Sequence, residues 1–122
     1  MPYVPDAGDI FRLQFTPQVR HEQAGHRPAV VISPARYNRT GLMLCCPITS
    51  KVKGYPFEVT ITGSTPSVVL SDQVKSLDWR ATQAKWKGTV SEAELAKVRG
   101  KALALIRGTR WMKIFAEGSV LK

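Results

Sequence analysis

Apolar and polar residues alternate in short runs along most of this chain, which is the pattern of β-strands with one buried face. In the first run, the apolar positions Phe11, Leu13 and Phe15 are separated by single polar residues. Residues 28–33 are instead almost continuously apolar and β-branched, which is typical of a strand buried on both faces. The pattern predicts strands over residues 9–15, 28–33, 42–48, 57–61 and 68–74, and one or two more within residues 79–90.

Residues with turn chemistry separate these runs. Residues 38–41, Asn-Arg-Thr-Gly, are suited to reversing the chain, and residues 63–67 predict another turn. Residues 34–38 predict an irregular turn, and residues 75–78 break the strand pattern. Residues 16–27 form a loop of about twelve residues, which is long for a compact domain and marks a candidate binding loop.

A helix is predicted to begin at Ser91. Ser91 and Glu94 have the S-x-x-E spacing of a capping box. Gly108 is expected to end the helix. Residues 109–122 are too apolar for a linker and fit no element. The apolar stripe of the helix consists of Leu95, Val98, Ala102 and either Leu105 or Ile106.

These elements predict a mainly β fold with a C-terminal helix. Short strands at even spacing favour a small barrel or sandwich over βαβ units. The chain has 122 residues, which predicts a single domain, 1–122, with a real hydrophobic core. It contains no apolar run of about 18 residues, and its first residues lack the features of a secretory signal. We therefore expect a cytoplasmic protein that does not enter a membrane.

Cysteines and histidines give no indication of a metal site or a cofactor. Cys45 and Cys46 are adjacent, so they fit neither a disulfide framework nor a zinc knuckle, and core packing is the expected role of at least one of them. His21 and His26 lie five residues apart without clustered carboxylates.

Charge is the most informative bulk property. Eighteen Lys and Arg residues against nine Asp and Glu residues give a net charge of +9. Such an excess indicates a polyanionic partner, such as nucleic acid, an anionic surface or an acidic protein, although it also serves solubility.

Arg27 precedes the apolar segment that begins at Pro28, so it is predicted to lie where the long loop enters a stiff strand. Functional side chains are often found at such junctions. His21, Glu22 and His26 precede it within the same loop. On composition alone, a solvated loop without chemistry explains these residues equally well.

Several motifs, in order, resemble the MazF/PemK (Kid) ribonuclease toxins of bacterial toxin–antitoxin modules, and most closely the MazF branch. The match runs from about residue 3 to residue 106. The segments that carry it are residues 21–31 (HEQAGHRPAVV), 47–50 (PITS), 53–59 (KGYPFEV) and 72–76 (DQVKS).

The resemblance implies an SH3-like, strongly bent β-barrel with a C-terminal helix, and a homodimer. It implies metal-independent cleavage of single-stranded RNA, typically messenger RNA, at short sequences. It also implies a cognate antitoxin whose acidic C-terminal segment covers the RNA groove. Residues 109–122 depart from the family, whose members usually stop near the end of the helix.

Metal-free RNA cleavage uses the adjacent 2′-OH as nucleophile, so it needs a base, cationic donors for the phosphorane and an acid for the leaving oxygen. Arg27 matches the family's catalytic arginine, and its planar guanidinium can grip two phosphate oxygens. Thr49 matches the hydroxyl that donates to the scissile phosphate, although a threonine at a strand end can also cap backbone. Glu22 is preferred as the base over Asp72, because Kid-like members pair that aspartate with an arginine where this chain has Leu70.

The remaining candidates are RNA contacts. Lys51 and Lys53 supply salt-dependent affinity, while Gln73 and Lys75 can contact a base edge and a phosphate. His21 is also a candidate base. The aromatic residues Tyr55, Phe57 and Trp79 are expected mainly in the core. The predicted RNA-binding set is His21, His26, Ser50, Lys51, Lys53, Asp72, Gln73 and Lys75.

Two rival functions remain open from the sequence. One is a toxin of the same fold that poisons DNA gyrase, like CcdB, and cuts nothing. The other is a basic barrel that binds RNA without cleaving it.

Overall fold

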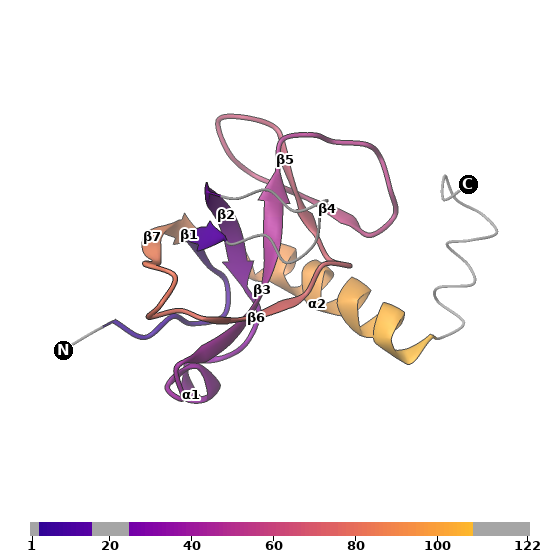
Figure 1. Ribbon diagram of the computed structural model, residues 1–122. Coiled ribbons are helices and arrows are strands. Elements are labelled where there is room, and N and C mark those ends of the chain that lie inside the picture. Colours follow the sequence, from indigo (N-terminus) through magenta and orange to yellow (C-terminus); the bar gives the residue numbers. More distant parts are fainter. Residues whose placement is uncertain (1–2, 16–24, 109–122) are drawn as a thin grey trace.

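Residues 3–15 and 25–108 are those that the computed structural model describes, and they form seven strands and two helices (Figure 1). In chain order these are β1 (Asp9–Phe15), β2 (Gly25–Val31), α1 (Ala35–Asn38), β3 (Leu42–Thr49), β4 (Glu58–Ile61), β5 (Ser67–Leu70), β6 (Lys75–Asp78), β7 (Lys85–Thr89) and α2 (Glu92–Arg107).

Strand β3 organises the sheet. It pairs with β2 along one edge, and along the other edge with β6 through Leu42–Cys45 and with β5 through Ile48 and Thr49. The strand order is β4-β5-β3-β2-β1-β7, and all pairs are antiparallel. Because β5 and β6 follow one another along the same edge of β3, the sheet curls into a half-barrel (Figure 1). The predicted mainly β, SH3-like fold with a C-terminal helix is confirmed.

The curled sheet buries a hydrophobic cluster on each face. Adjacent residues of a strand point to opposite faces, so Cys45 belongs to one cluster, with Phe11 and Trp79, and Cys46 to the other, with Val98 of α2. Both cysteines are buried free thiols, and desolvation raises the pKa of each to about 12. Core packing, as predicted for at least one of them, therefore holds for both.

Helix α2 covers one of these faces and has the predicted ends. The Ser91 hydroxyl accepts from the Glu94 amide at 3.1 Å, and the Glu94 carboxylate accepts from the Ser91 amide at 2.8 Å. Gly108 ends the helix with φ +60°. Val98 and Ala102 are buried, whereas Ile106 is 76% exposed and Leu105 is half-buried. Leu105 is therefore the better fourth member of the apolar stripe.

The structure differs from the predicted pattern in four segments, and backbone or side-chain partners explain each difference. The predicted loop over residues 16–27 is shorter, because β1 pairs with β2 as far as Phe15↔Gly25. The predicted turn over residues 34–38 contains the short helix α1, whose Asn38 is fully buried and donates to the backbone oxygens of Pro5 and Ser33.

The strand predicted over residues 68–74 ends at Leu70, where the Gln73 amide donates to the Leu70 oxygen at 3.1 Å and turns the chain. Residues 75–78, predicted to break the pattern, form β6, because the first half of β3 supplies their backbone partners. Residues 109–122 lie outside the described residues. In the part of the chain that is described, no helix is both long and apolar enough to cross a membrane.

Candidate functional site

Arg27 and Thr49 lie at the same end of neighbouring strands. The last register pair between β2 and β3 is Ala29↔Pro47, and Arg27 and Thr49 are each two residues beyond it. Residues two apart in a strand share a face, so the register directs both side chains to one face of the sheet. Both are half-buried. The guanidinium and the hydroxyl are thus placed to approach one ligand.

Arg27 differs from its predicted setting. It is the third residue of β2, where it lies opposite Leu13 of β1, rather than a residue at the junction of loop and strand. The strand continues through Pro28, which lies opposite Arg12. Two residues of pairing beyond Arg27 hold its backbone, so the guanidinium projects from regular structure.

The Thr49 hydroxyl has a defined orientation. Its oxygen accepts from the Lys51 amide at 3.1 Å. This is the backbone contact expected of a threonine at a strand end. A hydroxyl that accepts one hydrogen bond retains its own proton to donate, so this contact orients Thr49 without removing its capacity to bind a phosphate oxygen.

The basic loop after β3 is anchored by a residue that the sequence pattern did not single out. Alternation with Val59 and Ile61 predicts an outward-facing Glu58, yet Glu58 is only 9% exposed. Its carboxylate accepts from the Lys53 amide at 3.2 Å and from the Gly54 amide at 2.9 Å. The backbone of the loop is therefore tied down while the side chains of Lys51 and Lys53 remain exposed.

The turn between β5 and β6 carries the second group of candidates. Burial raises the pKa of Asp72, and the charge of Glu58 adds to this, while a hydrogen bond from its own backbone amide opposes it. Gln73 is exposed, and Lys75 lies half-buried opposite Cys45. Next to Asp72, the Ser71 hydroxyl is fully buried and has no hydrogen-bond partner within the described part of the chain.

The two groups lie along one strand but are not adjacent. Lys75 pairs with Cys45, which is four residues from Thr49, a separation of roughly 13 Å along β3. Cys45 and Thr49 share a face because four is an even number of residues. A ligand several subunits long can therefore contact Thr49 and Lys75 together, whereas a single small molecule cannot.

Three predicted residues are not placed. His21 and Glu22 lie outside the described residues, and for His26 only the backbone is described, in β2 opposite Gln14. Of the aromatic candidates, Trp79 is buried and donates to the Asn38 oxygen at 2.7 Å, as expected for the core. Tyr55 is 41% exposed and stacks on Phe57 with ring centroids 5.3 Å apart.

No group of three or more His, Cys, Asp or Glu side chains that could hold a metal ion occurs among the residues that the structure describes. What the site offers is a guanidinium, a hydroxyl, exposed ammonium groups and a carboxylate with a raised pKa. These groups are suited to binding phosphate and moving protons.

Comparisons with known proteins agree with this chemistry. The family model described as the PemK-like, MazF-like toxin of type II toxin–antitoxin systems matches residues 6–106. The endoribonuclease toxin MazF of Escherichia coli K12 is 53% identical over 106 residues, which cover 85% of this chain and 96% of that protein. The endoribonuclease PemK of Escherichia coli is 31% identical, over 83% of this chain and 81% of that protein.

Solved structures with the same fold include MazF from Deinococcus radiodurans. Its crystal structure superimposes with a TM-score of 0.79 at 51% identity, covering 88% of this chain and all of that one. A MazE–MazF crystal structure from the same organism gives a TM-score of 0.78 at 51% identity, with the same coverage.

Proposed function

This chain belongs to the PemK-like, MazF-like family of toxins of type II toxin–antitoxin systems and is an endoribonuclease of that family, and we propose that it cuts single-stranded messenger RNA at short sequences without a metal ion. The β2–β3 register, which directs Arg27 and Thr49 to one end and one face of the sheet, carries the proposal. A phosphodiester bound there meets a guanidinium and a hydroxyl donor together.

In the proposed reaction the ribose attacks its own phosphodiester. The 2′-oxygen loses its proton to a base and forms a bond to phosphorus, while the bond from phosphorus to the 5′-oxygen breaks and that oxygen gains a proton. The products are a 2′,3′-cyclic phosphate and a 5′-OH end. The barrier falls where charge on the phosphorane is stabilised and both proton transfers have a partner.

Each side chain has a role set by its chemistry. Arg27 stabilises the phosphorane, because the planar fork of its guanidinium can donate to two phosphate oxygens at once. Thr49 donates to a non-bridging oxygen. Glu22 is the proposed base, because an ionised carboxylate accepts the 2′-OH proton. Asp72 is the alternative base, and its raised pKa makes its carboxylate more basic than that of an ordinary aspartate.

The other predicted residues extend the site along the RNA. Lys51 and Lys53 contact phosphates, and Gln73 reads a base edge. Lys75 holds a further phosphate beside the middle of β3. The full proposed RNA-binding set is His21, His26, Ser50, Lys51, Lys53, Asp72, Gln73 and Lys75.

The proposal extends to partners. A cognate antitoxin with an acidic C-terminal segment binds the same basic surface and so competes with RNA. The MazE–MazF crystal structure of the relative from Deinococcus radiodurans supports an antitoxin as a partner. The toxin acts as a homodimer in the cytoplasm. The net charge of +9 supports both proposed ligands, RNA and the acidic segment of the antitoxin, because both are polyanions.

The test is to incubate the purified protein with single-stranded RNA in EDTA and map the ends. Cleavage that leaves 5′-OH ends, and that is lost when the nucleotide before the cut carries no 2′-OH, is the expected result. Cleavage that requires added Mg²⁺ or leaves 5′-phosphate ends contradicts the chemistry. Intact RNA together with inhibition of gyrase would instead indicate a gyrase poison, and intact but bound RNA a non-catalytic barrel.

A further inference from the structure

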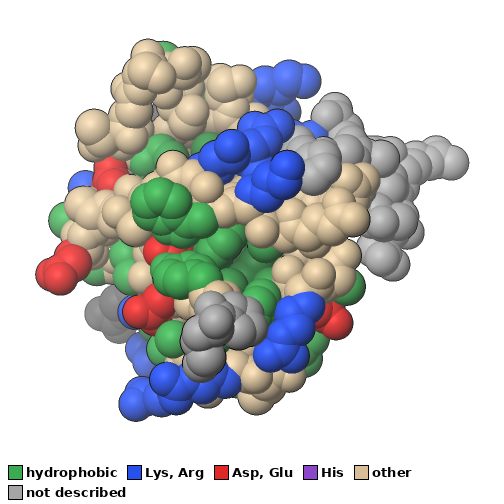
Figure 2. All heavy atoms as spheres, turned by 90° about the vertical axis from the view of Figure 1, so that its left-hand side faces the viewer, with side chains coloured by type: hydrophobic (Ala, Val, Ile, Leu, Met, Phe, Trp, Pro, Cys, Tyr) green, Lys and Arg blue, Asp and Glu red, His purple; other side chains and the backbone are tan. Residues whose placement is uncertain are grey.

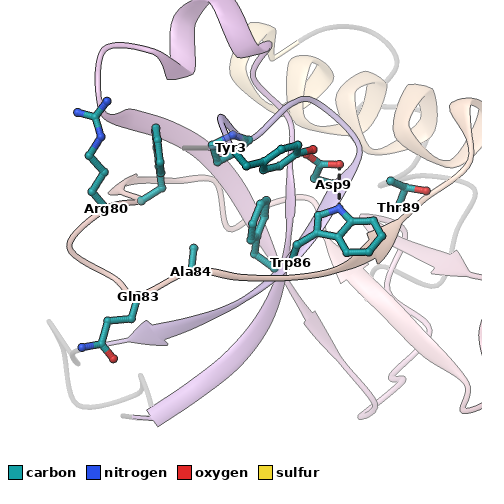
Figure 3. A pocket seen from close by; sticks show the side chains of 10 residues that line it. Tyr3, Asp9, Arg80, Gln83, Ala84, Trp86 and Thr89 are labelled. Carbon is teal, nitrogen blue, oxygen red and sulfur yellow. Dashed lines mark hydrogen bonds between the residues drawn. The ribbon is translucent and has the colours of Figure 1, made fainter. Parts of the chain in front are cut away.

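An apolar pocket of about 820 Å³ lies outside the predicted site, between the N-terminal arm, β1 and residues 79–89. Four of the side chains that line it are aromatic: Tyr3, Phe11, Trp79 and Trp86. Figure 3 labels Tyr3 and Trp86. The pocket belongs to the β1 and β7 side of the molecule, where hydrophobic side chains gather at the centre of the face seen in Figure 2.

One carboxylate orders two of these rings. Asp9 is 4% exposed, and its Oδ2 accepts from the Tyr3 hydroxyl at 2.6 Å, while its Oδ1 accepts from the Trp86 indole nitrogen at 3.3 Å (Figure 3). The hydrogen bond with Asp9 is the main cause that raises the pKa of Tyr3 to about 12, so its hydroxyl remains a donor. Yet Tyr3 and Trp86 are more than half exposed. Their polar atoms are held while their ring faces stay open.

One cationic side chain, Arg80, lines the pocket. The Arg80 guanidinium lies 4.7 Å from the centre of the Trp79 ring. Trp86 lies in β7, which is an edge strand of the sheet, and the neighbouring Lys85 and Lys87 are exposed but do not line the pocket. Exposed aromatic rings beside a positive charge suit single-stranded nucleic acid, because any base can stack on a ring while its phosphate meets a cation.

The pocket and the candidate cleavage site lie along the same strand, β1. Phe11 of the pocket and the buried Leu13 share a face of β1, and Leu13 lies opposite Arg27 of β2. Moving from Leu13 to Phe11 covers only two residues, roughly 7 Å along the strand. This separation is within the length of a few nucleotides of an RNA whose phosphate is held at Arg27.

We propose that this pocket binds an unpaired base of the RNA substrate, stacked on Trp86 and Tyr3, a few nucleotides from the phosphate at Arg27. It is a binding subsite that extends the footprint of the enzyme, and it rests on the proposed ribonuclease function. The aromatic side chains and the short distance along β1 to the residue paired with Arg27 favour RNA over a protein side chain. An apolar side chain of an acidic peptide is the competing occupant.

The experiment couples a protein change with an RNA change. The probe is a short RNA centred on the mapped cleavage site, with a 2′-deoxy nucleotide before the cut so that it binds without being cleaved. A single abasic position is moved along this RNA, and the affinity of each probe is measured for the wild type and for Trp86→Ala. The variant should bind the intact probe roughly 5- to 100-fold more weakly, as expected when one stacked base is lost.

Coupling between Trp86→Ala and the abasic position tests whether a base binds in the pocket. We expect one abasic position to weaken binding by the wild type and to have no further effect on Trp86→Ala. Trp86→Phe should keep most of the affinity, and Ile106→Ala, which removes an exposed apolar side chain on α2, should keep all of it. Far-ultraviolet circular dichroism of each variant shows whether the fold is retained.

Equal affinities for wild type and Trp86→Ala, or additive effects at every abasic position, would overturn the subsite while cleavage by the wild type leaves the proposed function standing. Weaker binding of an acidic peptide by Trp86→Ala, with RNA affinity unchanged, would assign the pocket to a protein partner and also overturn it. A wild type that neither cuts nor binds RNA would remove both proposals together.

Discussion

Arg27 has its backbone in regular structure and its side chain at the candidate site. Its pairing with Leu13 is made by backbone atoms, so it does not depend on the guanidinium. Thr49 is similar, because its hydroxyl accepts from the Lys51 amide and keeps its own proton to donate. The backbone pairing that positions Arg27 should therefore survive substitution of its side chain, so variants at this position report on catalysis.

Arg27→Ala should lower the single-turnover rate of RNA cleavage by about 10²–10³-fold or more, because a donor to the phosphorane is lost. Arg27→Lys keeps the charge but loses the planar fork, so its rate should lie between those of the wild type and Arg27→Ala. Arg12→Ala, which removes an exposed arginine of the neighbouring strand, is the control. An Arg27→Ala rate close to that of the wild type would exclude this residue from the mechanism.

At the scale of elements, β3 and the loop after it determine how the site is presented. The loop joins β3 to β4, and Glu58 ties its backbone to the start of β4. Helix α2 is tied to the same region, since the Lys101 ammonium donates to the backbone carbonyl oxygen of Glu58 at 2.9 Å. Cations in an anchored loop lose less conformational freedom when RNA binds.

Glu58→Gln should loosen this loop. The amide replaces one of two carboxylate acceptors with a donor, so one of the two loop amides loses its partner, at a cost of about 1–3 kcal/mol in the free energy of unfolding. We expect the KM for RNA to rise while kcat changes little, measured by steady-state cleavage and urea unfolding. Unchanged stability together with unchanged KM would show that the hydrogen bonds from the loop amides to the Glu58 carboxylate contribute neither to folding nor to RNA binding.

The capping box of α2 makes a second prediction at this scale. Ser91→Ala should reduce stability by about 1 kcal/mol. Glu94 accepts from the amides of Ser91 and Thr62, which lowers its pKa below the ordinary 4.5. A lowered pKa in the folded state stabilises the fold above the unfolded value, and this contribution is lost as pH falls through the folded value.

The difference in melting temperature between wild type and Glu94→Gln should therefore be largest near neutral pH and shrink as the pH falls below about 4.5. Circular dichroism melts between neutral and acidic pH measure it. Glu92→Gln, at a neighbouring exposed position of the first turn, is the matched control. A difference that stays constant with pH would show that the charge of Glu94 contributes nothing.

At the scale of the whole molecule, the charge of +9 determines how the protein meets its ligand. The charge is spread over several elements, from the loop after β3 to α2, so part of it lies far from the candidate site. Each cation that contacts a phosphate releases a counterion, and only those contacts contribute to the salt dependence of binding.

RNA affinity should fall steeply with salt, with a slope of about −0.7 in log K against log salt for each phosphate contact. Lys51→Ala and Lys53→Ala should each make the slope shallower by about 0.7. Arg107→Ala, at the exposed end of α2, should leave the slope unchanged. Binding titrations between low and physiological salt measure these slopes, and a flat dependence for the wild type is incompatible with the proposed contacts.

Local patterns in the sequence were sufficient for much of this protein. Alternation located β1, the core of β3 and β4, the capping box placed the start of α2 at Ser91, and Gly108 marked its end. These features depend on residues within a few positions of each other. The motifs that indicated the toxin family, and with it Arg27 and Thr49 as candidates, were also readable without coordinates.

Contacts between distant segments decided the rest. Strand β6 exists because β3 pairs with it, β2 begins at Gly25 because β1 extends to meet it, and α1 is held by the buried Asn38. Glu58 is buried against alternation because the loop amides need an acceptor. The pocket at Asp9 needs residues 77 positions apart to meet. Patterns in the sequence reflect the preferences of nearby residues for helix, strand or turn. These features instead arise from backbone and side-chain partners that only the folded sheet brings within reach.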